Sequence, residues 1–384
     1  MNKMVGVLLA LVVLGSMGTA MAATNATVAA EMHYKRVKIV KFDPVLENVT
    51  PYWIIIAAGA SEEGKKAVFE YIDSSKNLAE KEKLKLKKSI ISLWKKYGVV
   101  KVKKGDITLI TLKSGAKPMK EGENAILEKI AKAANEYFKE RYVENGNVEV
   151  KWFTDVHQDM IYIACQKWDV PNNLCNIARD HADDPDFWYQ VPPPPGYPDW
   201  MWKFIMQVVH SWTHYYNPER DWGSAPDEFE KYTNIAKNYY SSAKYNLAFE
   251  NLGYASHFLA DVGQPLHTGA EARQVALSLL LLRAPEYIHY AYEGYVSSNW
   301  YSGYNFRSYV YGVPVHHYVP ITDPEQAVKN LAGYTHQYAD TIVWAIFTNP
   351  DGWQNNQNIR NLTQNCIMET TRYLLGLVDY VVQK

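Results

Sequence analysis

Histidine and acidic residues recur four positions apart in the C-terminal half of this chain. The stretch SHFLADVGQPLHTG contains His257 and Asp261 among apolar neighbours, and IHYAYE contains His289 and Glu293. On a helix, residues four apart lie on the same face, so each pair points in one direction. A carboxylate in apolar surroundings is costly unless it is paired or binds a metal ion. The spacing therefore indicates either a buried hydrogen-bonded pair or a metal site.

Further imidazoles and carboxylates surround these pairs along the chain. Gly263 and Pro265 end the first helix, so the chain can turn back and bring His267 close to Asp261. Imidazole and carboxylate suit zinc, and zinc sites with open positions are hydrolytic. The set is too large for one ion and predicts a cluster, in which neighbouring zinc ions activate water. Its other members are His157, Asp180, His181, Asp183, Asp184 and His214, while His210 is expected in the core or behind a ligand.

The stretch LGYASHFLADVGQPLH, residues 252–267, has a recognisable spacing. Its fixed positions are Leu252, Gly253, His257, Asp261, Pro265 and His267. In this pattern, LG-x3-H-x3-D-x3-P-x-H, the chain resembles the zinc-dependent phospholipase C and single-strand-specific nuclease superfamily. The resemblance covers most of residues 152–300, where THYYNPE is similar to the family's His–aromatic–aromatic–Asp–Pro segment with Asn217 in place of the acid.

That resemblance implies an all-α domain with a trinuclear zinc site. The implied ligands are Asp180, His214, His257 and Asp261 for one ion, Trp152 and His157 for a second with Asp261 as a bridge, and His267, His289 and Glu293 for a third. Asp180, as ligand or nearby base, would also orient the attacking water. Asp183 remains its rival, because ARDHADDP matches the family's Ala-Asp-before-Pro pattern only with one extra residue.

The resemblance also implies a cut between Lys151 and Trp152. In this family the mature enzyme begins with a Trp whose free amino group and carbonyl bind zinc, and Trp152 lies five residues before His157, as in the nuclease branch. Residues 23–151 would then be a propeptide. The alternative is a permanent extra domain, with Trp152 as an ordinary core residue.

Helical periodicity dominates the chain after residue 152, and we expect six to eight helices there. The predicted spans are 155–168, 200–214, 226–240, 243–261, 325–347 and 355–382, with VPPPPGYPDW as a rigid proline loop between them. Residues 152–384 are therefore expected to form an all-α bundle.

A small α+β domain is expected before it, over residues 23–120, followed by a helix and linker over 121–151. YWIIIAAGA, residues 52–60, predicts a buried strand, and Ser61 predicts the N-cap of a helix reaching about Tyr71. Further helices are expected over 79–97 and 123–143, with a hairpin over 99–112 that turns at Lys104-Gly105-Asp106.

Charge divides the chain near residue 150 although its formal net charge is −1. Residues 31–151 have about 25 Lys and Arg against 17 Asp and Glu, and the rest has about 14 against 24. The complementary charges make the N-terminal segment a plausible intramolecular partner of the C-terminal domain. The acidic C-terminal domain favours a phospholipid substrate and contact with a membrane surface, since nucleases use basic tracks. The aromatic residues and the nuclease-like spacing keep single-stranded nucleic acid as an alternative, and a secreted zinc-binding protein without turnover is a third.

The first 22 residues have the pattern of an export signal. Lys3 precedes a short apolar run from Val5 to Leu14, and Ala20-Met21-Ala22 fits a cleavage site. We therefore expect a secreted, cell-surface or periplasmic protein. Three cysteines do not make a disulfide scaffold, and Cys165–Cys175 is the one pair to consider.

Overall fold

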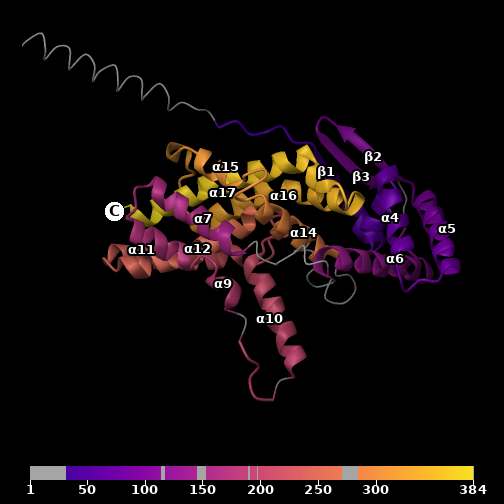
Figure 1. The fold of residues 1–384 in the computed structure, drawn as a ribbon, viewed down its shortest axis with the longest axis horizontal. Helices are drawn as coiled ribbons and strands as arrows, with labels where there is room; N and C mark the ends of the chain where they lie inside the picture. Colours follow the sequence, from indigo (N-terminus) through magenta and orange to yellow (C-terminus); the bar gives the residue numbers. More distant parts are fainter. Residues whose placement is uncertain are drawn as a thin grey trace, which may run out of the picture. The chain divides into compact units, whose positions relative to one another are not determined.

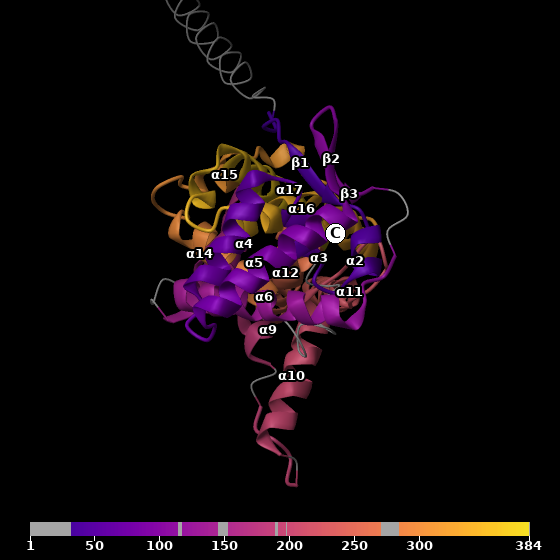
Figure 2. The ribbon, with the colours of Figure 1, turned by 90° about the vertical axis from the view of Figure 1, so that its right-hand side faces the viewer.

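Helices make up most of the chain in the computed structural model, which confirms the expected mainly α fold with a small sheet in its N-terminal part. The structure describes residues 32–113, 117–144, 153–188, 191–196, 198–269 and 284–383. Residues 35–384 form a single unit (Figures 1 and 2). The predicted export signal and the predicted cut after Lys151 both fall outside the described residues.

The sheet has three strands in the order β1-β3-β2. β2 (Val99–Lys104) and β3 (Ile107–Leu112) form the predicted antiparallel hairpin, and Gly105 in its turn has a φ of +61°. β1 (Ile39–Phe42) pairs with β3 in parallel and was not predicted. It has only four residues, too few for alternation to be visible in the sequence.

Helices flank this sheet in the N-terminal part. They are α2 (Val45–Val49), α3 (Trp53–Ala58), α4 (Glu62–Ser74), α5 (Glu80–Tyr97) and α6 (Glu121–Lys139), which continues as a π-helical turn to Glu144. Ser61 caps α4 as predicted, because its Oγ accepts a hydrogen bond from the Gly64 amide at 3.0 Å.

The predicted strand over residues 52–60 is wrong, because this segment forms α3. Ile55, Ile56, Ala57 and Ala58 are all at most 1% exposed. A segment buried on every side shows neither helical nor strand periodicity, so its sequence pattern alone cannot separate the two. The helix satisfies its backbone groups internally and needs no neighbouring strand.

The predicted helices of the C-terminal part are confirmed to within two residues at most ends. They are α7 (Phe153–Lys167), α10 (Asp199–His214), α11 (Ala225–Ser241), α12 (Tyr245–Gly263), α16 (Pro324–Thr348) and α17 (Gln357–Val382). Additional helices are α8 (Asn172–Asp180), α9 (Asp184–Phe187), α14 (Ala284–Ser298) and α15 (Arg307–Gly312). Cys165 of α7 and Cys175 of α8 lie side by side, and both are free thiols.

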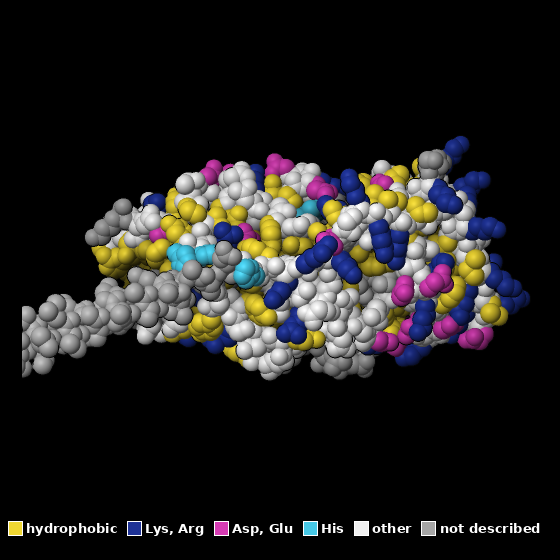
Figure 3. All heavy atoms as spheres, turned by 90° about the horizontal axis from the view of Figure 1, so that it is seen from above, with side chains coloured by type: hydrophobic (Ala, Val, Ile, Leu, Met, Phe, Trp, Pro, Cys, Tyr) yellow, Lys and Arg dark blue, Asp and Glu magenta, His cyan; other side chains and the backbone are white. Residues whose placement is uncertain are grey.

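Asparagines on α17 bind the N-terminal segment. The Asn365 side chain accepts from the Lys35 amide and donates to the Lys35 carbonyl, both at 2.8 Å. Asn358 does the same with Lys38, at 2.7 Å in each direction. Figure 3 shows Lys and Arg gathered at the end of this unit where β2 and α5 lie, in keeping with the basic charge of this part of the sequence.

None of the described helices combines the length and the apolar content that a membrane span requires.

Candidate metal centre

Helix α12 contributes the first pair of the predicted site. His257 and Asp261 lie one turn apart and are 0% and 1% exposed, with His257 Nε2 at 3.3 Å from Asp261 Oδ2. Their burial depends on close packing, since a Cβ at Gly253 would lie 2.5 Å from the Ala178 carbonyl oxygen of α8. The apolar residues of α12 therefore pack against neighbouring helices while this pair is held inside.

His157 completes the first group from helix α7. Its Nε2 lies 3.7 Å from Asp261 Oδ1, and its ring centroid is 4.6 Å from that of His257. The ligand atoms of this group all lie within 4.8 Å of one another, one each from His157, His257 and Asp261. All three residues are buried. The structure thus brings together three of the residues that the resemblance implies as ligands.

Asp186, His210 and His214 form a second group where α9 meets the end of α10. Asp186 Oδ1 lies 3.3 Å from His210 Nε2 and 3.6 Å from His214 Nε2. The same oxygen lies 3.4 Å from His257 Nε2, so Asp186 also faces the first group.

The third group consists of His267, His289 and Glu293. His267 lies in a single 3-10 turn (Pro265–His267) directly after α12, and α14 supplies the other two. Glu293 Oε1 forms an ion pair with His289 Nε2 and lies 3.4 Å from His267 Nε2. His267 Nδ1 is 3.7 Å from Asp261 Oδ1, so Asp261 faces this group as well.

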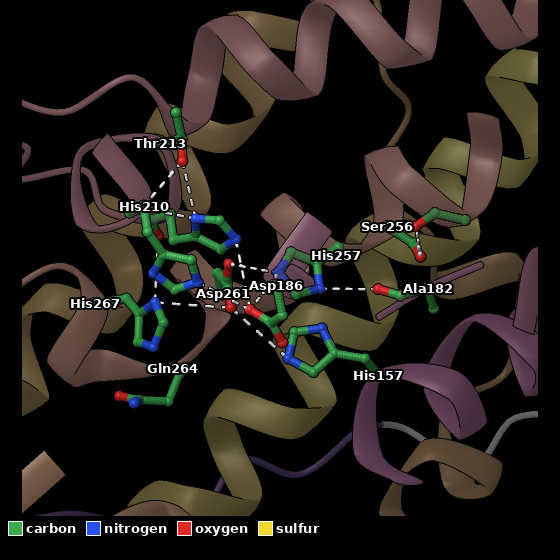
Figure 4. A network of polar contacts seen from close by, with 12 residues as sticks. His157, Ala182, Asp186, His210, Thr213, Ser256, His257, Asp261, Gln264 and His267 are labelled. Atoms are coloured by element: carbon green, nitrogen blue, oxygen red, sulfur yellow. Dashed lines mark hydrogen bonds and ion pairs between the residues drawn. The ribbon is translucent and has the colours of Figure 1, made fainter. Parts of the chain in front are cut away.

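Backbone carbonyls orient the imidazoles (Figure 4). His257 Nδ1 lies 2.8 Å from the Ala182 carbonyl oxygen, and His214 Nδ1 lies 2.7 Å from that of His210. A carbonyl accepts a hydrogen bond, so Nδ1 carries the proton and Nε2 is left as the ligand atom. Both Nε2 atoms point toward Asp186.

Several buried ligand atoms make no hydrogen bond within the described chain. They are His257 Nε2, Asp261 Oδ2, Asp186 Oδ2 and Glu293 Oε2. An unsatisfied buried polar atom costs about 1–3 kcal/mol, and more when it is charged. Bound cations would satisfy these atoms, and imidazole with carboxylate is the donor set that suits zinc. The residues present therefore fit a cluster of metal ions.

Electrostatic coupling inside the centre is strong. Burial opposes protonation of His257, but Asp261 and Asp186 outweigh it and raise the pKa of His257 to about 9. Burial raises the pKa of Asp261 well above its usual range. For Glu293 burial acts in the same direction, yet His289 and His267 lower its pKa to about 2. Groups with such opposed shifts in one buried place are typical of functional sites.

Asp180 does not lie in this centre, and the prediction that it orients the attacking water as a ligand or nearby base needs correction. Its side chain is 59% exposed and accepts hydrogen bonds from the Arg179 guanidinium at 2.7 and 2.9 Å. Its place is taken by Asp186, six residues later. Pro185 lies in the first turn of the short helix α9, and this turn brings Asp186 against the imidazoles of α10 and α12.

Asp183, the rival of Asp180, is buried but belongs to none of the three groups. Its carboxyl accepts a hydrogen bond from Gln158 Nε2 at 2.7 Å, and burial raises its pKa to about 8. His210 lies closer to the centre than expected, with its ring 4.0 Å from that of His214 and stacked on it. Trp152 lies outside the described residues, so its predicted role stays a prediction.

Comparisons with known proteins support the resemblance indicated by the motifs. Over 92 residues the chain is 33% identical to a phospholipase C of Listeria monocytogenes. The matched segment covers 22% of this chain and 29% of that protein. The chain thus spans less than a third of that relative's length. The motif and this segment together indicate likeness to the zinc-dependent phospholipase C superfamily. No protein-family model matches the chain.

Among solved structures, the alpha toxin from Clostridium absonum has a TM-score of 0.32 to this chain at 12% identity. The likeness covers 66% of this chain and 65% of the toxin.

Proposed function

We propose that this protein is a zinc-dependent hydrolase of phosphodiester bonds, of the phospholipase C type. One observation carries the proposal: three groups of imidazoles and carboxylates, two of them fully buried, adjoin one another and are linked by Asp186 and Asp261. A single structural zinc needs only four ligands, and adjacent metal groups are typical of phosphate-ester hydrolases.

Zinc bound there would lower the pKa of a bound water toward neutrality and offset charge on phosphate oxygens. The chain's own residues hold the ligands in place. Backbone carbonyls fix the ring of His257 and the ring of His214, and burial keeps bulk water away from Asp261. Preorganised groups need no rearrangement during the reaction, and such preorganisation is a large part of catalysis.

Single-strand-specific nuclease activity is the second candidate. Tyr215 favours it, because this half-buried ring lies 4.6 Å from the ring of His267 and 6.2 Å from that of His289. An aromatic ring beside the centre could stack on a nucleobase, which contributes about 1–3 kcal/mol per base.

Metal analysis and two assays on one preparation test these functions. We expect two or three zinc ions per chain and hydrolysis of short-chain phosphatidylcholine. Hydrolysis of single-stranded DNA instead would establish the nuclease, and zinc without either activity would leave a binding protein. Asp261→Asn should lose metal and nearly all turnover, and retained zinc and rate in that variant would refute the scheme.

We further propose that the protein is exported and is cut between Lys151 and Trp152. The supporting observations are the apolar N-terminal pattern and the position of His157 in the first metal group, five residues after Trp152. N-terminal sequencing of the secreted protein tests both steps. A mature chain that starts near residue 23 would refute the internal cut, and an unprocessed Met1 would refute export by a cleaved signal.

A further inference from the structure

Helix α10 and the proline loop before it form an apolar arm, which we define as Val191–Trp212. Trp200 is 71% exposed, Val191 48% and Trp212 41%. Among the side chains of the arm that the structure describes, none is buried. Figures 1 and 2 both show α10 extending away from α11 and α12.

Apolar residues cover most of the circumference of this helix, while Asp199, Lys203 and His210 share a narrower polar face. The described apolar side chains of α10 are all half-buried or exposed: Trp200, Met201, Trp202, Ile205, Met206, Val208, Val209 and Trp212. A helix with a wide apolar face that contains tryptophan normally packs in a core or lies in the interface of a membrane. Apart from His210, Asp199 and Lys203 are the only titratable acidic and basic residues in the sequence of the arm, so it offers no basic track for nucleic acid.

The arm is a folded hairpin rather than a loose loop. Trp202 Nε1 donates a hydrogen bond to the Val191 carbonyl oxygen at 2.8 Å, which ties the proline loop to the helix. Proline restricts the backbone of the loop further. Rigid aromatic side chains presented in this way bury large area at low cost in conformational entropy.

The base of the arm is part of the metal centre. His210 and His214, in the last turns of α10, belong to the group around Asp186. Phe187, next to Asp186, is itself 54% exposed. Candidate metal ligands therefore lie near both ends of the arm in the sequence: Asp186 lies before the proline loop, and His210 and His214 lie at the end of α10.

We propose that the Val191–Trp212 arm inserts into the surface of a phospholipid bilayer and holds the metal centre against it. This inference rests on the proposed function and names the form of substrate, lipid packed in a membrane. Lipid fits better than a protein partner, because the exposed side chains of Val191, Trp200 and Trp212 are spread over the proline loop and both ends of α10 rather than gathered in one compact patch. Tryptophan favours the interface, where its ring meets both acyl chains and water. The helix has 16 residues, about 24 Å, and does not span the hydrocarbon core.

Sedimentation with phosphatidylcholine vesicles tests the arm, using the metal-loaded full chain. The variant is Val191→Asp with Trp200→Asp, and the control is Leu247→Asp, a 41% exposed leucine at the start of α12. We expect wild type and control to bind, and the double variant to bind at least 10-fold more weakly. Hydrolysis of vesicles should fall by a similar factor, while hydrolysis of monomeric short-chain phosphatidylcholine stays within twofold.

A second measurement does not depend on turnover or on aspartate in the arm. The native cysteines are all buried, so Trp200→Cys can be labelled selectively with an environment-sensitive dye. The emission should shift to shorter wavelength on adding vesicles. Equal vesicle binding by all variants, or no shift of the dye emission, would overturn the proposal that the arm inserts into the bilayer. A wild-type dimer that becomes monomeric in the double variant, with vesicle binding unchanged, would assign the arm to self-association instead.

Failure of the proposed function has a different signature. Vesicle binding that depends on Val191 and Trp200, together with no hydrolysis of the short-chain lipid, would refute the proposed hydrolase activity. Membrane insertion of the arm would still be supported.

Discussion

Buried carboxylates are the residues on which the candidate metal centre depends. Asp261 is 1% exposed and Glu293 is 2% exposed, and each has an oxygen with no hydrogen bond in the described chain. Asp186 is less buried, with its side chain 12% exposed, but it faces three imidazoles. Removing charge from a carboxylate that faces several ligands should release metal rather than merely weaken the fold.

Asp186→Asn and Asp180→Asn make a matched pair, six residues apart. We expect Asp186→Asn to lose about one metal ion per chain and at least about 100-fold in kcat/KM, because indirect metal contacts already cost 10–100-fold. Asp180→Asn should keep the wild-type metal content and kcat/KM, since the carboxylate of Asp180 pairs with Arg179 at the surface. Metal analysis and hydrolysis kinetics check this, and equal metal content in the two variants would count against Asp186 as a ligand.

At the scale of elements, what could be predicted depended on periodicity. The long amphipathic helices and the hairpin around Gly105 were visible in the sequence, because each repeats its pattern over many residues. The buried helix α3 and the four-residue strand β1 were not visible in the sequence, because neither shows a repeating pattern. Asp186 was missed for a related reason: four acidic residues crowd Asp180–Asp186, and only the turn made by α9 decides which of them points inward.

Helix α17 is held close to the segment before α16. A Cβ at Gly376 would lie 1.9 Å from the Val319 carbonyl oxygen, and the Val319 amide donates to the Arg372 carbonyl at 3.1 Å. Gly376→Ala should therefore lower the free energy of unfolding by about 1–3 kcal/mol through overpacking. Gly333→Ala, at an exposed position in α16 with nothing within 4 Å, should raise it by about 0.5–1 kcal/mol.

Chemical denaturation of the metal-loaded protein would measure both glycine variants. A Gly376→Ala variant as stable as wild type would show that α17 can move away from Val319. A destabilised Gly333→Ala variant would mean that α16 is not a regular helix at that position.

At the scale of the whole molecule, metal and fold should be coupled. The centre joins residues from α7, α9, α10, α12 and α14, so bound ions would cross-link these elements. Chelation should lower the melting temperature by roughly 5 °C or more, since ligand at 100–1,000 times Kd contributes about 3–4 kcal/mol. Calorimetry with and without chelator checks this, and re-added zinc should restore the transition. An unchanged melting temperature after proven metal loss would refute the coupling.

The N-terminal part should remain bound to the helices after a cut near residue 150. Its contacts are spread along residues 35–144: the Lys35 backbone pairs with Asn365, the Val40 amide donates to Thr341 Oγ1 at 2.9 Å, and Tyr142 Oη donates to the Pro350 carbonyl at 3.0 Å. Tyr71 and Tyr142 are buried in this contact.

We expect the two pieces of a chain cut near residue 150 to co-elute in gel filtration and to separate only in denaturant. Asn358→Ala with Asn365→Ala should weaken the association, because both side chains bind backbone groups in both directions. Free elution of the N-terminal piece under native conditions would instead favour a propeptide that leaves.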